Sequence, residues 1–213
     1  MELFKPDDFK VFDIKGFNER MAAILTRIRP KLASIGQALE PKLSQAVDSP
    51  LYVHVAKHAR RTVNPPNDTW AALGTSQRGY KKDVHFKVAV SRNCVRFLFE
   101  AGLEYYAKEE WVRGWNSGFK GFASSIKSAK GLSWFRNEHD EEPASQLAEL
   151  DSAGIKALAG ELTRRKDGQF VLGVRIPESK FVGLSEKQVE TLAMAAFGPL
   201  APLFHIHEAR VLE

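Results

Sequence analysis

The sequence predicts an α+β fold, with a central, mostly antiparallel sheet of about 5–6 strands packed by about four helices. Apolar residues recur every three or four positions from Phe17 to Val47, which is typical of an amphipathic helix. Between positions 85 and 99 they alternate with polar residues, as in strands that bury one face. The last 30 or so residues again favour a helix, so helices are expected at both ends of the chain. A length of 213 residues suits one domain, which we expect to span residues 1–213.

The N-terminal helix is predicted from a continuous apolar stripe with charged residues on its other faces. Pro30 lacks a backbone N–H and should kink or split this helix near its middle, and Pro41 is expected to start a further turn. Asp7 or Asp8 would cap a short helix that precedes it. The stripe consists of Phe17, Met21, Ile24, Leu25, Ile28, Leu32, Ile35, Leu39, Leu43 and Val47.

The middle of the chain predicts a meander of short strands. Residues 64–68, Asn-Pro-Pro-Asn-Asp, favour a turn because the prolines fix φ and the Asn and Asp side chains bond to their own backbone. Strands are expected at residues 69–73, 85–91 and 95–99, with Arg92 and Asn93 as a tight turn between the last two. A turn this short joins antiparallel strands.

The second half of the chain alternates between helical and extended patterns. Its expected elements are a helix at 105–128, a strand at 132–135, an acidic loop at 137–145, a helix at 152–166, a strand at 170–176, and a last, nearly apolar helix that opens at a capping box of Ser185 and Gln188.

Composition excludes several classes of protein. Hydrophobic residues make up 44% and charged residues 27%, which is ordinary for a globular domain. The single cysteine, Cys94, excludes an intrachain disulfide framework and a cysteine metal cage. The longest apolar run, residues 192–204, is shorter than the ~20 residues that a membrane span needs, and the N-terminus lacks the apolar core of a signal peptide. We therefore expect a cytoplasmic protein.

Positive charge is concentrated in one segment. Residues 54–87 hold seven Lys or Arg against two Asp, so their net charge of +5 equals that of the whole chain. The same segment contains His54, His58 and His85, three of the six histidines. A clustered positive field attracts anions such as phosphates. The alternative is a solvated basic loop whose charges pair with acids elsewhere in the fold.

The polar faces of the expected strands collect Lys87, Arg96 and Arg175. If helices cover only one face of the sheet, these cations line an open face. If both faces are covered, the cations must pair with acids, and Glu100 is the nearest candidate. The sequence leaves both arrangements open.

The basic segment resembles the fingerprint of a known family. The matching residues are 54–61 (His-Val-Ala-Lys-His-Ala-Arg-Arg), 64–70 (Asn-Pro-Pro-Asn-Asp-Thr-Trp) and 78–86 (Arg-Gly-Tyr-Lys-Lys, two further residues, then His-Phe). With the N-terminal run from Asp7 to Leu32, the pattern is similar to the YktB-like family, a bacterial family of unknown function. The resemblance covers most of the chain and implies a compact single-domain α+β protein, but no activity.

The leading functional hypothesis is an anion site for a nucleotide or a phosphorylated metabolite. Arginine offers planar bidentate donors for phosphate, and the ring of Tyr80 or Trp70 would stack on a base. The alternative interpretation places Trp70 in the core and pairs Arg60 with internal acids. The candidate ligand-binding residues are Arg60, Arg61, Asn67, Arg78, Tyr80, Lys81 and Lys82.

Two further functions remain open. An enzyme would use His58 or His85 as general base, with Asp68 to orient it. An interaction module would instead dock an acidic protein or RNA through the basic segment. The common phosphate-loop, hydrolase and zincin motifs are missing, so no cofactor is indicated.

Metal binding is not expected, although two pairs of histidines have spacings that occur in metal sites. His54 and His58 are four residues apart and would share one face of a helix, with His85 or Asp68 as a third ligand. His205 and His207 would share a face only in an extended segment.

Overall fold

The computed structural model describes residues 1–206 and confirms the α+β class. One sheet of seven strands has the order β1-β2-β3-β4-β7-β5-β6, and every neighbouring pair is antiparallel. The strand count exceeds the prediction because the short strands β1 and β6 were not predicted from the sequence. The strands are β1 (Tyr52–Val55), β2 (Asp68–Gly74), β3 (His85–Ser91), β4 (Cys94–Ala101), β5 (Ser133–Phe135), β6 (Ser145–Gln146) and β7 (Phe170–Pro177).

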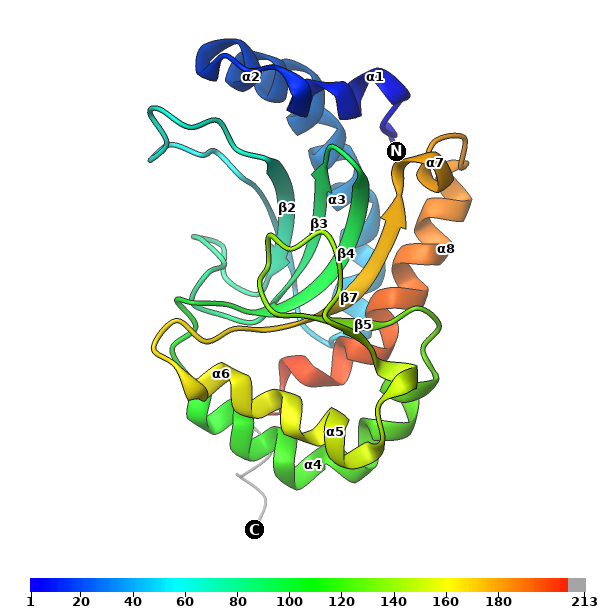
Figure 1. The fold of residues 1–213 in the computed structure, drawn as a ribbon. Helices are drawn as coiled ribbons and strands as arrows, with labels where there is room; N and C mark the ends of the chain where they lie inside the picture. The colour runs from blue at the N-terminus through cyan, green and yellow to red at the C-terminus, as the bar shows by residue number, and fades with distance from the viewer. Residues whose placement is uncertain (207–213) are drawn as a thin grey trace.

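The helices cover one face of the sheet and lie at both of its ends, with α1 and α2 opposite α4, α5 and α6 (Figure 1). α3 packs on β1 and β2, and α8 packs on β4 and β7. α4, α5 and α6 contact one another at one end of the sheet. The helices are α1 (Pro6–Phe9), α2 (Phe17–Ala23), α3 (Arg29–Ala46), α4 (Lys108–Ser128), α5 (Ser152–Ala157), α6 (Glu161–Arg164), α7 (Glu178–Phe181) and α8 (Glu186–Phe197). Among the described residues, no helix combines the length and the apolar character needed to cross a membrane.

The long N-terminal helix tolerates both of its prolines. A π turn at Ile24–Ile28, where the Arg29 N–H bonds to the Ile24 carbonyl, joins α2 to α3 and leaves Pro30 in the first turn of α3. Pro41 does not start a new turn, as predicted, but lies inside α3. A proline inside a helix costs about 3 kcal/mol, which here is offset because Leu39 and Leu43 on either side are fully buried.

The two faces of the sheet differ in chemistry. Alternate residues of β3 and β4, such as Phe86 and Phe97, pack under the helices in the main core. The intervening residues carry charge on the opposite face, yet they are also buried. The loop between β5 and β6 (residues 136–144) crosses in front of β3 and β4 and covers this polar face (Figure 1). The charged residues buried there are Asp68, His85, Lys87, Arg96 and Glu100.

Candidate functional site

Arg96 links the polar face of the sheet to the loop above it. Its Nη2 donates to Oδ2 of Asp68 at 2.7 Å, and its Nη1 donates to the carbonyls of Glu138 and Asp140 at 2.9 and 2.6 Å. The Arg96 side chain is fully buried, so each of these bonds replaces one that water would make. One guanidinium thus fixes the start of β2 and both neighbours of His139 in the loop.

A second buried cation, Lys87, occupies the neighbouring position on β3. Its ammonium pairs with Glu138 of the loop and lies 3.4 Å from Oε2 of Glu100 and 4.1 Å from the centre of the Trp70 ring. Burial would lower the pKa of Lys87, but the charges of Glu100 and Glu138 outweigh it and raise that pKa. The pairing with Glu100 is the one that the sequence indicated for a covered face.

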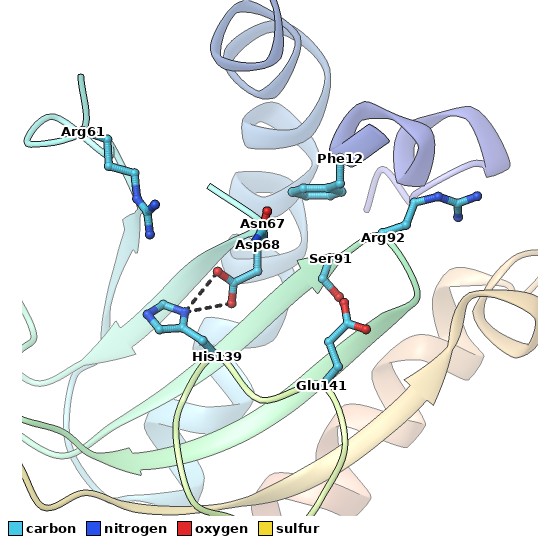
Figure 2. A pocket seen from close by; sticks show the side chains of 8 residues that line it. All are labelled: Phe12, Arg61, Asn67, Asp68, Ser91, Arg92, His139 and Glu141. Atoms are coloured by element: carbon cyan, nitrogen blue, oxygen red, sulfur yellow. Dashed lines mark hydrogen bonds and ion pairs between the residues drawn. The ribbon is translucent and has the colours of Figure 1, made fainter. Parts of the chain in front are cut away.

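His139 and Asp68 form a hydrogen-bonded pair (Figure 2). The Nδ1–H of His139 points at both carboxylate oxygens of Asp68, at 3.0 and 3.1 Å. Burial would raise the pKa of Asp68, but the hydrogen bond from His139 and the charges of His139, Arg96 and Lys87 hold it below its usual value. The same hydrogen bond raises the pKa of His139 against the effect of burial.

His58 lies on the other side of Trp70. Its backbone is left-handed, with a φ of 52°, and its Nε2 shares a hydrogen bond of 2.9 Å with Oγ1 of Thr69. Burial lowers the pKa of His58 to about 4, so its imidazole is neutral at physiological pH. Its ring meets the Trp70 ring edge-on at 5.3 Å.

Two hollows of about 340 and 510 Å³ open over this polar face. Arg61 and His139 line both, so we treat the two as one space and call it the basic groove. The smaller hollow is also lined by Lys57, His58, Arg60, Trp70, Tyr80, Lys81 and Glu138, and the larger by Phe12, Asn67, Asp68, Ser91, Arg92 and Glu141.

Three cations of the basic groove have no acid partner. Within residues 1–206, no carboxylate oxygen lies within 4.0 Å of Lys57, Arg60 or Arg61. All three are exposed, and the nearest protein acceptor of Arg61 is the carbonyl of Asn64 at 3.5 Å. Lys87 and Arg96, which lie beneath the groove, each pair with at least one carboxylate. The unpaired positive charge of the groove therefore lies at its rim.

The predicted ligand-binding residues divide between two places. Arg60 and Arg61 lie at the basic groove, and Tyr80 and Lys81 border it. Arg78 and Lys82 line a separate hollow of about 460 Å³ on the other side of Tyr80 and Lys81.

Asn67 and Trp70 also make contacts within the protein, although Asn67 lines the larger hollow of the groove. The side-chain oxygen of Asn67 accepts from Arg20 at 3.2 Å, so it holds the N-terminal helix to the turn before β2. Trp70 is 9% exposed, has Lys87 over its ring and donates its indole N–H to the Tyr80 hydroxyl at 2.7 Å. Trp70 is therefore part of the floor of the groove, as in the alternative interpretation, and its face is not open to a base.

The helical spacing assumed for His54 and His58 is wrong. His54 lies in β1, where its Nε2 is 2.9 Å from the Ser76 carbonyl, and His58 follows in a turn. Within the described part of the chain no three His, Cys, Asp or Glu residues group as metal ligands. His205 is 2.7 Å from the Val47 carbonyl, and His207 lies outside the described residues.

The histidine that Asp68 orients was not among the predicted residues. Asp68 bonds to His139, whereas His85 is buried, with its Nδ1 3.1 Å from the Asp83 carbonyl and its Nε2 3.4 Å from Glu100. The sequence indicated an acidic loop at residues 137–145, and the one histidine within that loop was its only signal of a site.

Comparison with known proteins identifies the family. The profile described as "Domain of unknown function (DUF1054)" matches residues 4–204. The chain belongs to this family. It is 33% identical over 206 residues to the UPF0637 protein of Oceanobacillus iheyensis, covering 97% of each chain. The UPF0637 protein of Bacillus licheniformis is 31% identical to it, over 95% of each chain. The UPF0637 protein of Bacillus mycoides is also 31% identical, over 96% of this chain and 97% of its own. The resemblance to the YktB-like family is confirmed, and these family members carry no activity in their names.

Proposed function

We propose that this DUF1054 protein binds a small anionic ligand, a nucleotide or a phosphorylated metabolite, in the basic groove. The observation that carries the proposal is the set of three cations, Lys57, Arg60 and Arg61, that face the groove without an acid partner in the described chain. Unpaired cations at the rim of a hollow gain most from an added anion, because no internal ion pair has to be broken first.

The size and the polarity of the groove suit a small ligand. Hollows of about 340 and 510 Å³ lie in the ~300–1,000 Å³ range of small-molecule sites. Arginine binds phosphate oxygens with two parallel N–H donors, and lysine adds a point charge. On the loop side, the carboxylate of Glu138 and the ring of His139 supply an acceptor and a donor for hydroxyl groups of the ligand.

Isothermal titration tests the proposal with inorganic phosphate and a panel of nucleotides at constant ionic strength. The double variant Arg60→Ala/Arg61→Ala should weaken binding at least tenfold, since a hydrogen bond to a charged group contributes about 1.5–3 kcal/mol. The matched control Arg165→Ala/Lys166→Ala removes two exposed cations from the loop before β7 and should bind like the wild type. Equal losses in the two variants, or no binding by the wild type, would contradict the proposal.

The second candidate function is docking of RNA or of an acidic protein. Arg78 and Lys82 favour it, because they extend the exposed positive charge beyond the basic groove. Binding to a nucleic acid would fall steeply with salt, with a slope on logarithmic axes that approaches the number of phosphates contacted. A single small anion in the groove predicts a shallow slope, so one salt series distinguishes the two functions.

A further inference from the structure

The Asp68–His139 pair has the geometry of an acid–base dyad. Asp68 is 5% exposed, and its carboxylate accepts from Arg96 as well as from Nδ1–H of His139. The His139 side chain is 43% exposed, and its second nitrogen, Nε2, points away from Asp68 (Figure 2). A buried carboxylate that holds one nitrogen of an exposed histidine fixes the tautomer and the direction of the other nitrogen.

Hydrogen bonds from Arg96 fix the backbone on both sides of His139. The carbonyls of Glu138 and Asp140, on either side of His139, both accept from the same Arg96 guanidinium that binds Asp68. The Glu138 side chain is tied down by Lys87. The histidine therefore sits on a short segment that is fixed at both ends, which is the preorganisation that proton transfer requires.

His139 lies on the wall of the proposed anion site. His139 and Arg61 line both hollows of the basic groove. The charged groups that face the His139 ring are Asp68, Glu138 at 3.8 Å from Nε2, and the more distant cation Lys87. The two acids favour the protonated ring and raise the pKa of His139, which suits a group that donates a proton.

We propose that His139 is the general acid of a phosphate monoester hydrolase, with Asp68 as its positioning residue. The inference rests on the proposed anion site, since Lys57, Arg60 and Arg61 would hold the phosphoryl group. A water oxygen forms the new bond to phosphorus while the P–O ester bond breaks and its electron pair passes to the ester oxygen. That oxygen takes the proton from Nε2 of His139 and leaves as an alcohol, and the attacking water then returns a proton to Nε2. The products are one alcohol and one inorganic phosphate for each ester and water consumed.

The substitution His139→Asn separates this role from a structural one. The Asn amide stands in for Nδ1–H and keeps a donor to Asp68, but it has no counterpart of Nε2. Phosphate release is measured from alkyl esters (nucleoside 5′-monophosphates and glycerol phosphate) and from p-nitrophenyl phosphate. We expect a loss of about 10²–10⁴-fold on the alkyl esters, and a much smaller loss on p-nitrophenyl phosphate, because p-nitrophenolate leaves without being protonated.

The outcomes discriminate between the two proposals. Equal losses on both kinds of ester would assign His139 a structural role and overturn the inference. Binding of inorganic phosphate without release from any ester by the wild type would also overturn it, while the proposed anion site would stand. If inorganic phosphate does not bind at all, the proposed function fails together with the inference. The control Arg165→Ala/Lys166→Ala should turn over every ester like the wild type.

Discussion

Replacing Arg96 by methionine tests whether the buried network holds the polar face together. The change leaves the buried Asp68 carboxylate without its guanidinium and takes the donor from the carbonyls of Glu138 and Asp140. Arg175 provides a matched control, because it lies directly opposite Arg96 on the neighbouring strand, β7. Its partner Glu142, at 2.8 Å, is 74% exposed, so this ion pair belongs to the surface.

The two arginines should differ several-fold in their effect on stability. Breaking a buried ion pair costs about 3–5 kcal/mol, because the charge that remains has lost a partner inside the protein. Within the described residues, Asp68 would keep only the hydrogen bond from His139 and the more distant charge of Lys87. A surface pair contributes about 0–1 kcal/mol. For a chain of this size each kcal/mol corresponds to about 2–4 °C in Tm. We therefore expect Arg96→Met to lower Tm by about 6–20 °C, and Arg175→Met by less than about 4 °C.

Urea unfolding followed by tryptophan fluorescence measures the difference. Trp70, one of four tryptophans, lies on the polar face against Lys87, so the signal follows unfolding of the whole domain, this face included. The denaturation midpoint of Arg96→Met should fall while the slope m stays near the wild-type value, which would indicate a loss of stability without a change in the unfolded state. If both arginine variants unfold at the same urea concentration, the buried network of Arg96 stabilises the fold no more than a surface ion pair does.

Three further predictions concern other buried positions. His58 has a pKa of about 4 in the folded protein against about 6.5 unfolded, so the unfolded chain binds more protons between these values. Stability should fall as the pH drops from 6.5 to 4, and His58→Gln should flatten that fall in urea titrations at each pH. Gly173→Ala should lower the free energy of unfolding by about 1–3 kcal/mol, since the added Cβ would lie 2.2 Å from the Phe97 carbonyl oxygen. Gly121→Ala, where α4 has open space around the position, should raise the free energy of unfolding by about 0.5–1 kcal/mol in the same assay. Burial raises the pKa of the Cys94 thiol, so a thiol reagent should modify it only after unfolding, and rapid labelling of the native protein would show that the site opens.

Much of the fold could be predicted because its signals are local. The β3–β4 hairpin follows from apolar residues at every second position on both sides of a two-residue turn at Arg92 and Asn93. β1 was not predicted because its four residues, Tyr-Val-His-Val, are too few to show a clear alternation of polar and apolar residues. In the structure all four are half-buried, so neither face of the strand is distinguished. The path of α3 through Pro41 was mispredicted because tertiary burial of its neighbours outweighs the local cost of proline.

The sequence predicted the cations of the candidate site but not its Asp68–His139 dyad. Its cations are close together along the chain, so Arg60 and Arg61 could be singled out by charge alone. The dyad could not, because 71 residues separate Asp68 from His139 and only the β5–β6 loop folding over the sheet brings them together. The pairing of Lys87 with Glu100 could be predicted from the sequence, because the two residues lie on the two strands of one hairpin.

Mapping of amide chemical shifts during a titration with inorganic phosphate tests the central claim most directly. At constant ionic strength, the account predicts that shifts at Lys57, Arg60, Arg61 and His139 saturate together with a single Kd. Amides around the exposed lysines at the end of α4 should stay unchanged. Shifts that are absent from the basic groove, or that rise without saturation at surface cations in general, would contradict a specific anion site.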